Sequence, residues 1–113
     1  MSRVDDLAVE LATAIQESDE YKQYLRCRSE LMQDEELFRK VNEYRRNNFY
    51  LQNQSNNPRL VEDVEAFHAQ NAELTANILV NKYLLAEMAL CRMIKQVERT
   101  LIENVELDLD FLD

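Results

Sequence analysis

The residues of this chain that most readily do chemistry are few and far apart. There is one histidine, His68, and there are two cysteines, Cys27 and Cys91. A zinc site needs three or four converging ligands, and an iron–sulfur cluster usually takes four cysteines. The sequence therefore predicts a packed or rim histidine and two buried structural thiols. The alternative for Cys27 and Cys91 is an iron–sulfur cluster or ligand site shared with thiols of partner chains.

The sequence offers no setting that would activate a nucleophile. Glycine is absent, so an oxyanion hole or a phosphate-binding loop that needs close backbone approach is hard to build. Neighbouring acids are common, as at Asp5 and Asp6, but they fit helix starts, where the helix dipole stabilises negative charge. We expect a protein that is not an enzyme and has no cofactor of its own.

Two charged residues interrupt otherwise apolar helix faces. Arg28 lies among Tyr21, Tyr24, Leu25 and Leu31, and Glu87 lies among Tyr83, Leu84 and Leu90. An unpaired buried charge costs several kcal/mol. We hypothesise that Glu87 pairs with Arg28 or with Arg45 and fixes the helix register. The alternative is that both charged ends reach solvent while their stems cover apolar surface.

Length, composition and net charge limit the classes of protein to which this chain can belong. At 113 residues there is room for one domain, and 46% hydrophobic residues suffice for a core. A net charge of −9 opposes direct binding to nucleic acid. No apolar run approaches a membrane span, and acids break the N-terminal apolar residues that a signal peptide would need. We expect a cytoplasmic protein.

Helical periodicity covers nearly the whole chain. Apolar spacing predicts a helix over 2–17, a second after Ser18 and a third capped by Asp34. The amide-rich loop 52–58 ends with Asn57 as a cap and Pro58 at the first position of the next helix. Helix continues to about residue 104, with a break near Asn77. These elements predict an all-α, antiparallel bundle of about four to five helices, with one domain over 1–106 and an acidic tail over 107–113.

The last helix is long for a chain of this size. A helix over 77–104 is about 42 Å long, and a compact monomer is roughly 35 Å across. Surplus apolar side chains off its main stripe then need a cover, which predicts a dimer or tetramer through Ile78, Leu79, Leu85 and Met88. The tail alternates apolar and acidic residues, so it either docks in a partner's groove or stays a solvated end.

Two segments carry a family resemblance. They are LAVELATAIQESDEYKQYLRCRSELMQDEEL near the start and VNKYLLAEMALCRMIKQVERTLIE near the end. On these segments the chain resembles the YlbF/YmcA family of small helical bacterial proteins. The residues that carry the resemblance are Ser18, Glu20, Tyr21 and Asp34 in the first segment, Leu84, Ala86 and Glu87 in the second, and the stretch YRRNNFYLQNQ between them. The resemblance implies an oligomerising α-helical protein. It also implies a complex with a YaaT-like partner that assists ribonuclease Y in mRNA maturation and affects competence, sporulation and biofilm formation.

Three functions remain open from the sequence. The first is a regulatory adaptor that self-associates and presents a polar face to larger protein partners. The second is a subunit that shares a cluster or ligand with partner chains through Cys27 or Cys91. The third is an acidic, chaperone-like helical module.

Overall fold

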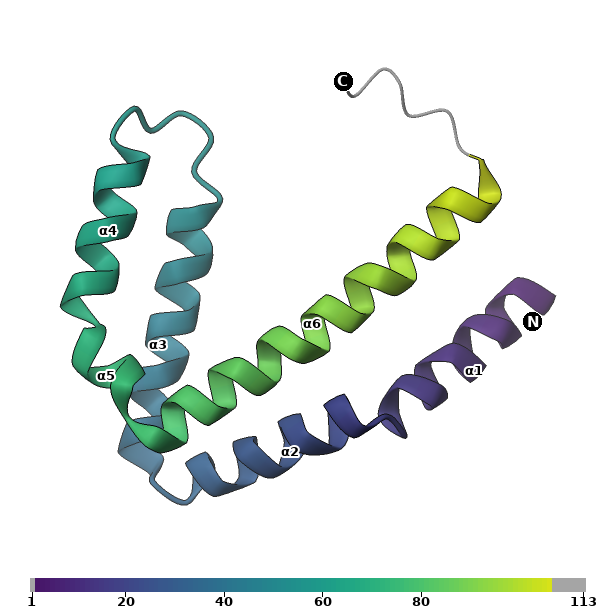
Figure 1. The fold of residues 1–113 in the computed structure, drawn as a ribbon, viewed down its shortest axis with the longest axis horizontal. Helices are drawn as coiled ribbons and strands as arrows, with labels where there is room; N and C mark the ends of the chain where they lie inside the picture. The colour runs from purple at the N-terminus through teal and green to yellow at the C-terminus, as the bar shows by residue number, and fades with distance from the viewer. Residues whose placement is uncertain (1, 107–113) are drawn as a thin grey trace. The chain divides into compact units, whose positions relative to one another are not determined.

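The structure is a computed structural model that describes residues 2–106, and 86% of it is helical. The described residues form six helices and no strand (Figure 1). These are α1 (Arg3–Gln16), α2 (Asp19–Met32), α3 (Glu35–Gln52), α4 (Leu60–Gln70), α5 (Ala72–Ala76) and α6 (Ile78–Val105). The all-α class and the long C-terminal helix are confirmed. The predicted tail, 107–113, lies outside the described residues, and the predicted domain boundary at 106 stays a prediction.

Three helices begin directly after the residues that the sequence predicts as their N-terminal caps. The side chain of Ser2 accepts a hydrogen bond from the Asp5 backbone N–H at 3.2 Å, and that of Asp34 accepts one from Leu37 at 3.1 Å. The Ser18 hydroxyl likewise accepts the Tyr21 backbone N–H at 3.2 Å. Each bond satisfies a donor that has no partner inside the helix, so local chemistry sets these boundaries.

The start of α4 differs from the prediction. The sequence places its cap at Asn57 and its first residue at Pro58, but the helix begins at Leu60. The Asn57 side-chain oxygen accepts from the Arg59 backbone N–H, two residues along, at 2.9 Å. A bond of that span makes a turn of its own before the helix, so Asn57 stabilises the loop and α4 starts two residues late.

Two asparagines divide the second half of the chain. The predicted break near Asn77 is confirmed: its side chain accepts from the backbone N–H groups of Leu79 and Val80 at 3.0 and 3.3 Å, and α6 follows. The sequence did not predict the second break, at Asn71. There the side-chain amide donates to the Phe67 carbonyl at 2.8 Å, which competes with the helix's own hydrogen bonds and separates α4 from α5.

The chain divides into two compact units, each with its own part of α2 and α6. The central unit covers residues 25–84. In it α3 and α4 lie side by side and antiparallel, joined by the amide-rich loop (Figure 1). Its buried side chains are Cys27, Leu31, Val41, Tyr44, Val80 and Tyr83. Apolar burial of these six side chains stabilises this unit.

The terminal unit consists of residues 1–24 and 85–113, of which 2–24 and 85–106 are described. Among those residues, only Ala86 and Leu90 are buried. Helix α6 ends in this unit at Val105, and Glu106 follows with a φ of 58° while its N–H donates to the Ile102 carbonyl at 3.2 Å. A left-handed residue at this position is the usual helix stop, and here a glutamate serves where many helices use glycine.

Candidate protein-binding surface

Helix α1 has an apolar stripe and no buried residue. Val4, Leu7 and Leu11 recur at helical spacing on one face and are 76%, 47% and 36% exposed. A stripe of this kind normally marks the side of a helix that packs on a core. Because none of α1 is buried, this stripe is available to another chain.

The apolar face of α6 shows the same exposure toward its C-terminal end. Ala86 and Leu90 are buried, but Ile94, Leu101 and Val105, farther along the helix, are 37%, 54% and 63% exposed. We call Val4, Leu7, Leu11, Ile94, Leu101 and Val105 together the terminal apolar surface. Its six large side chains all belong to the terminal unit. Large apolar side chains left exposed along a helix are candidates for protein association.

The four predicted oligomer-interface residues also lie largely open. Ile78, Leu85 and Met88 are 72%, 56% and 55% exposed, and Leu79 is half-buried. Their exposure agrees with the reason for choosing them, namely that the packing within the chain leaves them uncovered. Their part in an oligomer stays a prediction.

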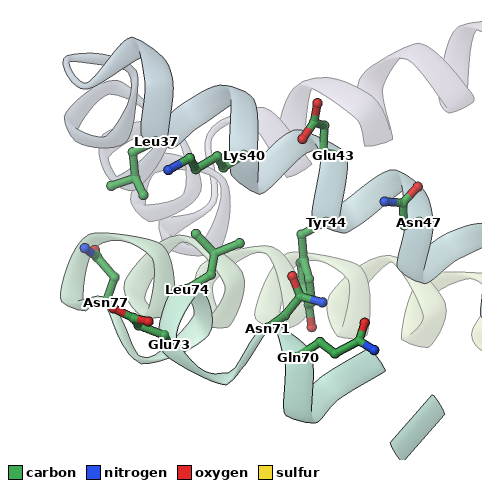
Figure 2. A pocket seen from close by; sticks show the side chains of 10 residues that line it. All are labelled: Leu37, Lys40, Glu43, Tyr44, Asn47, Gln70, Asn71, Glu73, Leu74 and Asn77. Atoms are coloured by element: carbon green, nitrogen blue, oxygen red, sulfur yellow. The ribbon is translucent and has the colours of Figure 1, made fainter. Parts of the chain in front are cut away.

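The central unit holds a polar hollow of about 510 Å³ between α3 and the α4–α5 segment. Figure 2 shows Lys40, Tyr44 and Asn47 from α3 on one side and Gln70, Asn71, Glu73 and Leu74 on the other. Leu37, Glu43 and Asn77 complete the lining. Four of the ten side chains are amides, each of which both donates and accepts hydrogen bonds. Chemically the hollow suits the binding of polar groups such as peptide backbone.

Tyr44 forms the most buried part of that lining. It is 9% exposed, and its ring stacks on Phe67 with centroids 5.3 Å apart and planes at 11°. Burial raises the pKa of the Tyr44 hydroxyl above its usual value of 10.0, because the charged phenolate loses solvation. The hydroxyl therefore stays protonated at neutral pH and is a hydrogen-bonding group, not a base.

The charged residues singled out in the sequence have different surroundings. Arg28 is exposed, whereas Arg45 and Glu87 are half-buried. Arg45 donates to the Asn42 side-chain oxygen at 3.1 Å, and its guanidinium lies 5.4 Å from the centre of the Tyr83 ring. The hypothesis that Glu87 pairs with Arg28 or Arg45 stays a prediction.

The two cysteines are not alike. Cys27 is buried in the central unit, as predicted, but Cys91 is exposed, so the prediction of burial is wrong for that thiol. Successive residues of a helix are turned by 100°, so Cys91 is turned away from the buried face that holds Leu90. Nowhere in residues 2–106 do three His, Cys, Asp or Glu side chains group as they would around a metal ion.

His68 is exposed on α4, with its ring edge against Phe67 at 5.9 Å between centroids. This matches the predicted rim position. Sequence reasoning missed another pair of aromatic residues, Phe49 and Tyr50, which are 63% and 62% exposed near the end of α3. Their adjacent aromatic types were a usable signal, because exposed aromatic side chains are enriched at the centres of protein interfaces.

Comparison with known proteins identifies the family. A family model described as "Control of competence regulator ComK, YlbF/YmcA" matches residues 4–106. The chain belongs to the YlbF/YmcA family. The match covers the six helices except for Arg3, the first residue of α1, so the resemblance carried by the first and last segments is confirmed. The description of the YlbF/YmcA family supports a regulatory role, and a regulatory family suggests a protein that is not an enzyme.

Two relatives have similar lengths and modest identity. A UPF0342 protein of Caldicellulosiruptor bescii is 27% identical over 108 residues, which is 94% of this chain and 91% of the relative. A UPF0342 protein of Caldicellulosiruptor saccharolyticus is 26% identical over 109 residues, 95% of this chain and 91% of the relative. No solved structure matches this YlbF/YmcA chain. None of the helices in residues 2–106 is long and apolar enough to cross a membrane.

Proposed function

We propose that this chain is a non-enzymatic regulatory adaptor that acts by binding other protein chains through the terminal apolar surface. The observation that carries the proposal is α1, an amphipathic helix with no buried residue. Fully burying a Val, Leu or Ile side chain contributes about 1.5–3 kcal/mol. A partner that covers several of these six side chains therefore gains enough free energy for specific association, even after the entropic costs of binding.

The side chains of the polar hollow support binding more than catalysis. Two charged residues of its lining already form ion pairs with other residues of α3. Lys40 pairs with Glu36 at 3.7 Å, and Glu43 pairs with Arg39 at 2.9 Å. The chain's only histidine, on exposed α4 surface, does not line the hollow. An amide-rich hollow of this kind is suited to hydrogen bonding with a partner.

The process we propose is the one implied by the family resemblance. The chain joins a YlbF/YmcA-like complex acting on ribonuclease-dependent mRNA maturation, and through it on competence, sporulation and biofilm control. The family description, which concerns a competence regulator, supports the regulatory part of this proposal. The net charge of −9 favours a role through protein partners over direct contact with RNA.

The test is affinity capture of the tagged full chain from bacterial cells, followed by mass spectrometry. The double variant Leu7→Glu, Leu11→Glu places two charges on the terminal apolar surface. The matched control, Thr13→Glu with Gln16→Glu, adds the same charge on exposed positions of the same helix that are not apolar. We expect wild type and control to retain a stoichiometric partner and the double variant to lose it. Equal recovery by all three chains would overturn the proposed surface.

A second readout tests the process. Transcript ends are mapped in a strain that lacks the chain and in strains that carry the wild type, the double variant or the control. We expect ribonuclease-dependent ends to be lost without the chain, and to be restored by the wild type and the control alone. Unchanged transcript ends in the deletion strain would overturn the mRNA-maturation role, while leaving partner binding to the capture experiment.

A further inference from the structure

The lining of the polar hollow includes a buried hydroxyl that the chain itself does not use. The side chain of Tyr44 points from α3 toward the α4–α5 segment (Figure 2), and the residue is only 9% exposed. Its hydroxyl makes no hydrogen bond to any other residue within 2–106. Buried polar groups in proteins normally have a hydrogen-bond partner. The Tyr44 hydroxyl is therefore a position at which an atom of a bound ligand can be held.

The four amide side chains of the lining also keep hydrogen-bonding groups free. Asn47 and Gln70 make no side-chain hydrogen bond to the rest of the described chain. Asn71 donates to the Phe67 carbonyl at 2.8 Å, which leaves its side-chain oxygen free to accept. Asn77 uses its side-chain oxygen to cap α6, which leaves its amide nitrogen free to donate. Both walls of the hollow therefore offer hydrogen-bonding groups to a ligand.

The length of the hollow matches a short extended peptide. Its α3 wall runs from Leu37 to Asn47, which is about 15 Å along the helix axis. An extended chain rises about 3.3 Å per residue, so roughly four to five residues fit along this wall. Figure 2 shows Leu37 and Leu74 toward one end of the hollow and Asn47 and Gln70 toward the other. An apolar side chain suits the first end, and main-chain N–H and C=O groups suit the second.

The charge of the lining favours a basic ligand. Lys40 and Glu43 are held in ion pairs along α3, whereas the exposed Glu73 has no ion-pair partner within residues 2–106. The net charge of the whole chain is −9. Both the local carboxylate and the overall field attract a lysine or arginine side chain. The same charges oppose a nucleic acid and a second copy of this acidic chain alike.

We propose that the polar hollow binds an extended peptide segment of a basic partner protein. The segment places an apolar side chain against Leu37 and Leu74 and a lysine or arginine against Glu73. Its main-chain groups form hydrogen bonds with the Tyr44 hydroxyl and with the amide side chains of the lining. The hollow belongs wholly to the central unit, and none of its residues is part of the terminal apolar surface. This inference therefore does not rest on the proposed function.

Selection from a display library of random heptapeptides tests the class of ligand, with the full-length chain as the target. We expect the enriched peptides to share a lysine or arginine close to an apolar residue. Each enriched peptide is then synthesised with a fluorophore, and its Kd for the full-length chain is measured by anisotropy. Enrichment of acidic peptides, of peptides without a basic residue, or of no peptide at all would overturn the proposal.

Substitutions in the lining test where the enriched peptide binds. Tyr44→Phe removes only the hydroxyl, and the pair Asn47→Ala, Gln70→Ala removes two amides. We expect each change to raise the Kd severalfold, because each removes hydrogen bonds to the peptide. The matched control, Gln33→Ala with Asn56→Ala, removes two exposed amides outside the hollow and should bind as wild type does. Circular dichroism shows whether each chain is folded, and a wild-type Kd in both folded lining variants would overturn the proposal.

A double-mutant cycle tests the contact with Glu73. Glu73→Gln in the protein and replacement of the basic residue by glutamine in the peptide should each raise the Kd about two- to fivefold, as expected for an exposed ion pair. Because the two changes remove the same contact, we expect both together to weaken binding no more than either alone. Glu65→Gln removes an exposed carboxylate of α4 that does not line the hollow, and it should leave the Kd unchanged. Fully additive effects would overturn the assignment of the basic residue to Glu73.

The variant Leu7→Glu, Leu11→Glu separates this inference from the proposed function. Both substitutions lie on α1, outside the hollow, so we expect this variant to bind the peptide with the wild-type Kd. Loss of peptide binding by the folded variant would place the peptide on α1 and overturn the inference. Recovery of the captured partner by this variant would instead count against the terminal apolar surface and leave the hollow unaffected.

Discussion

The guanidinium of Arg45 lies over the ring of Tyr83, 5.4 Å from the ring centre, and so joins α3 to the first turns of α6 within the central unit. Tyr83 is only 1% exposed, so the cation meets the ring largely away from water. A desolvated cation–π contact contributes up to about 2 kcal/mol.

We expect Arg45→Met to lower the free energy of unfolding by about 1–3 kcal/mol, because it removes this contact and the hydrogen bond to Asn42. Urea unfolding followed by circular dichroism measures the loss. The neighbouring exposed residue gives the control, and Arg46→Met should change stability by less than about 0.5 kcal/mol. Equal effects from the two substitutions would contradict a structural role for Arg45.

Tyr44 makes the free energy of unfolding depend on pH in the alkaline range. Its pKa is raised by burial, so the unfolded chain releases the hydroxyl proton near pH 10.0 while the folded chain still holds it. The folded state binds more protons in that window, and stability therefore falls as pH rises from about 10 toward the folded-state pKa. We expect Tyr44→Phe to reduce this fall. Urea unfolding of both chains from pH 7 to 11 provides the comparison, and parallel pH profiles would contradict the assignment.

Asn77 is the cap of α6. Its side-chain oxygen accepts from Leu79 and Val80, and Asn77→Ala leaves those two donors without that acceptor. We expect a loss of about 0.5–2 kcal/mol, the usual effect of removing a cap. Asn77→Asp keeps the acceptor and serves as the control, with near wild-type stability in thermal unfolding. If alanine and aspartate behave alike, the cap contributes nothing measurable.

The two cysteines should react at different rates. Cys91 is exposed and Cys27 is 4% exposed, so a thiol reagent reaches Cys91 directly and reaches Cys27 only when the chain opens. We expect one thiol to be labelled quickly in the native protein and two in urea. Mass spectrometry of the labelled peptides identifies which cysteine has reacted. Rapid labelling of Cys27 in the native chain would show that the central unit is looser than its packing indicates.

The fold was predictable where local chemistry decides it. Ser2, Ser18 and Asp34 each bond to a backbone N–H three residues along, so sequence spacing alone located three helix starts. The break at Asn71 was not predictable in this way. An asparagine inside a helical pattern either points to solvent or bonds back to a carbonyl, and the choice depends on its surroundings.

The candidate surfaces were predictable only in part. Apolar periodicity located the stripe of α1, but whether another helix covers it is a property of the folded chain. The same limit explains Cys91, which lies near an apolar stripe and yet is exposed. The polar hollow depends on the spacing between α3 and α4, which no local pattern encodes.

Helix α6 is continuous, yet the burial of its side chains is uneven. Its first half buries Val80, Tyr83, Ala86 and Leu90, whereas every residue from 98 to 105 is exposed. Backbone amides near Tyr83 should therefore exchange with deuterium only on global unfolding, and those beyond residue 98 through local fraying. Binding a partner along the second half would slow exchange there first. The far end of α6 thus offers a built-in reporter of occupancy that needs no label.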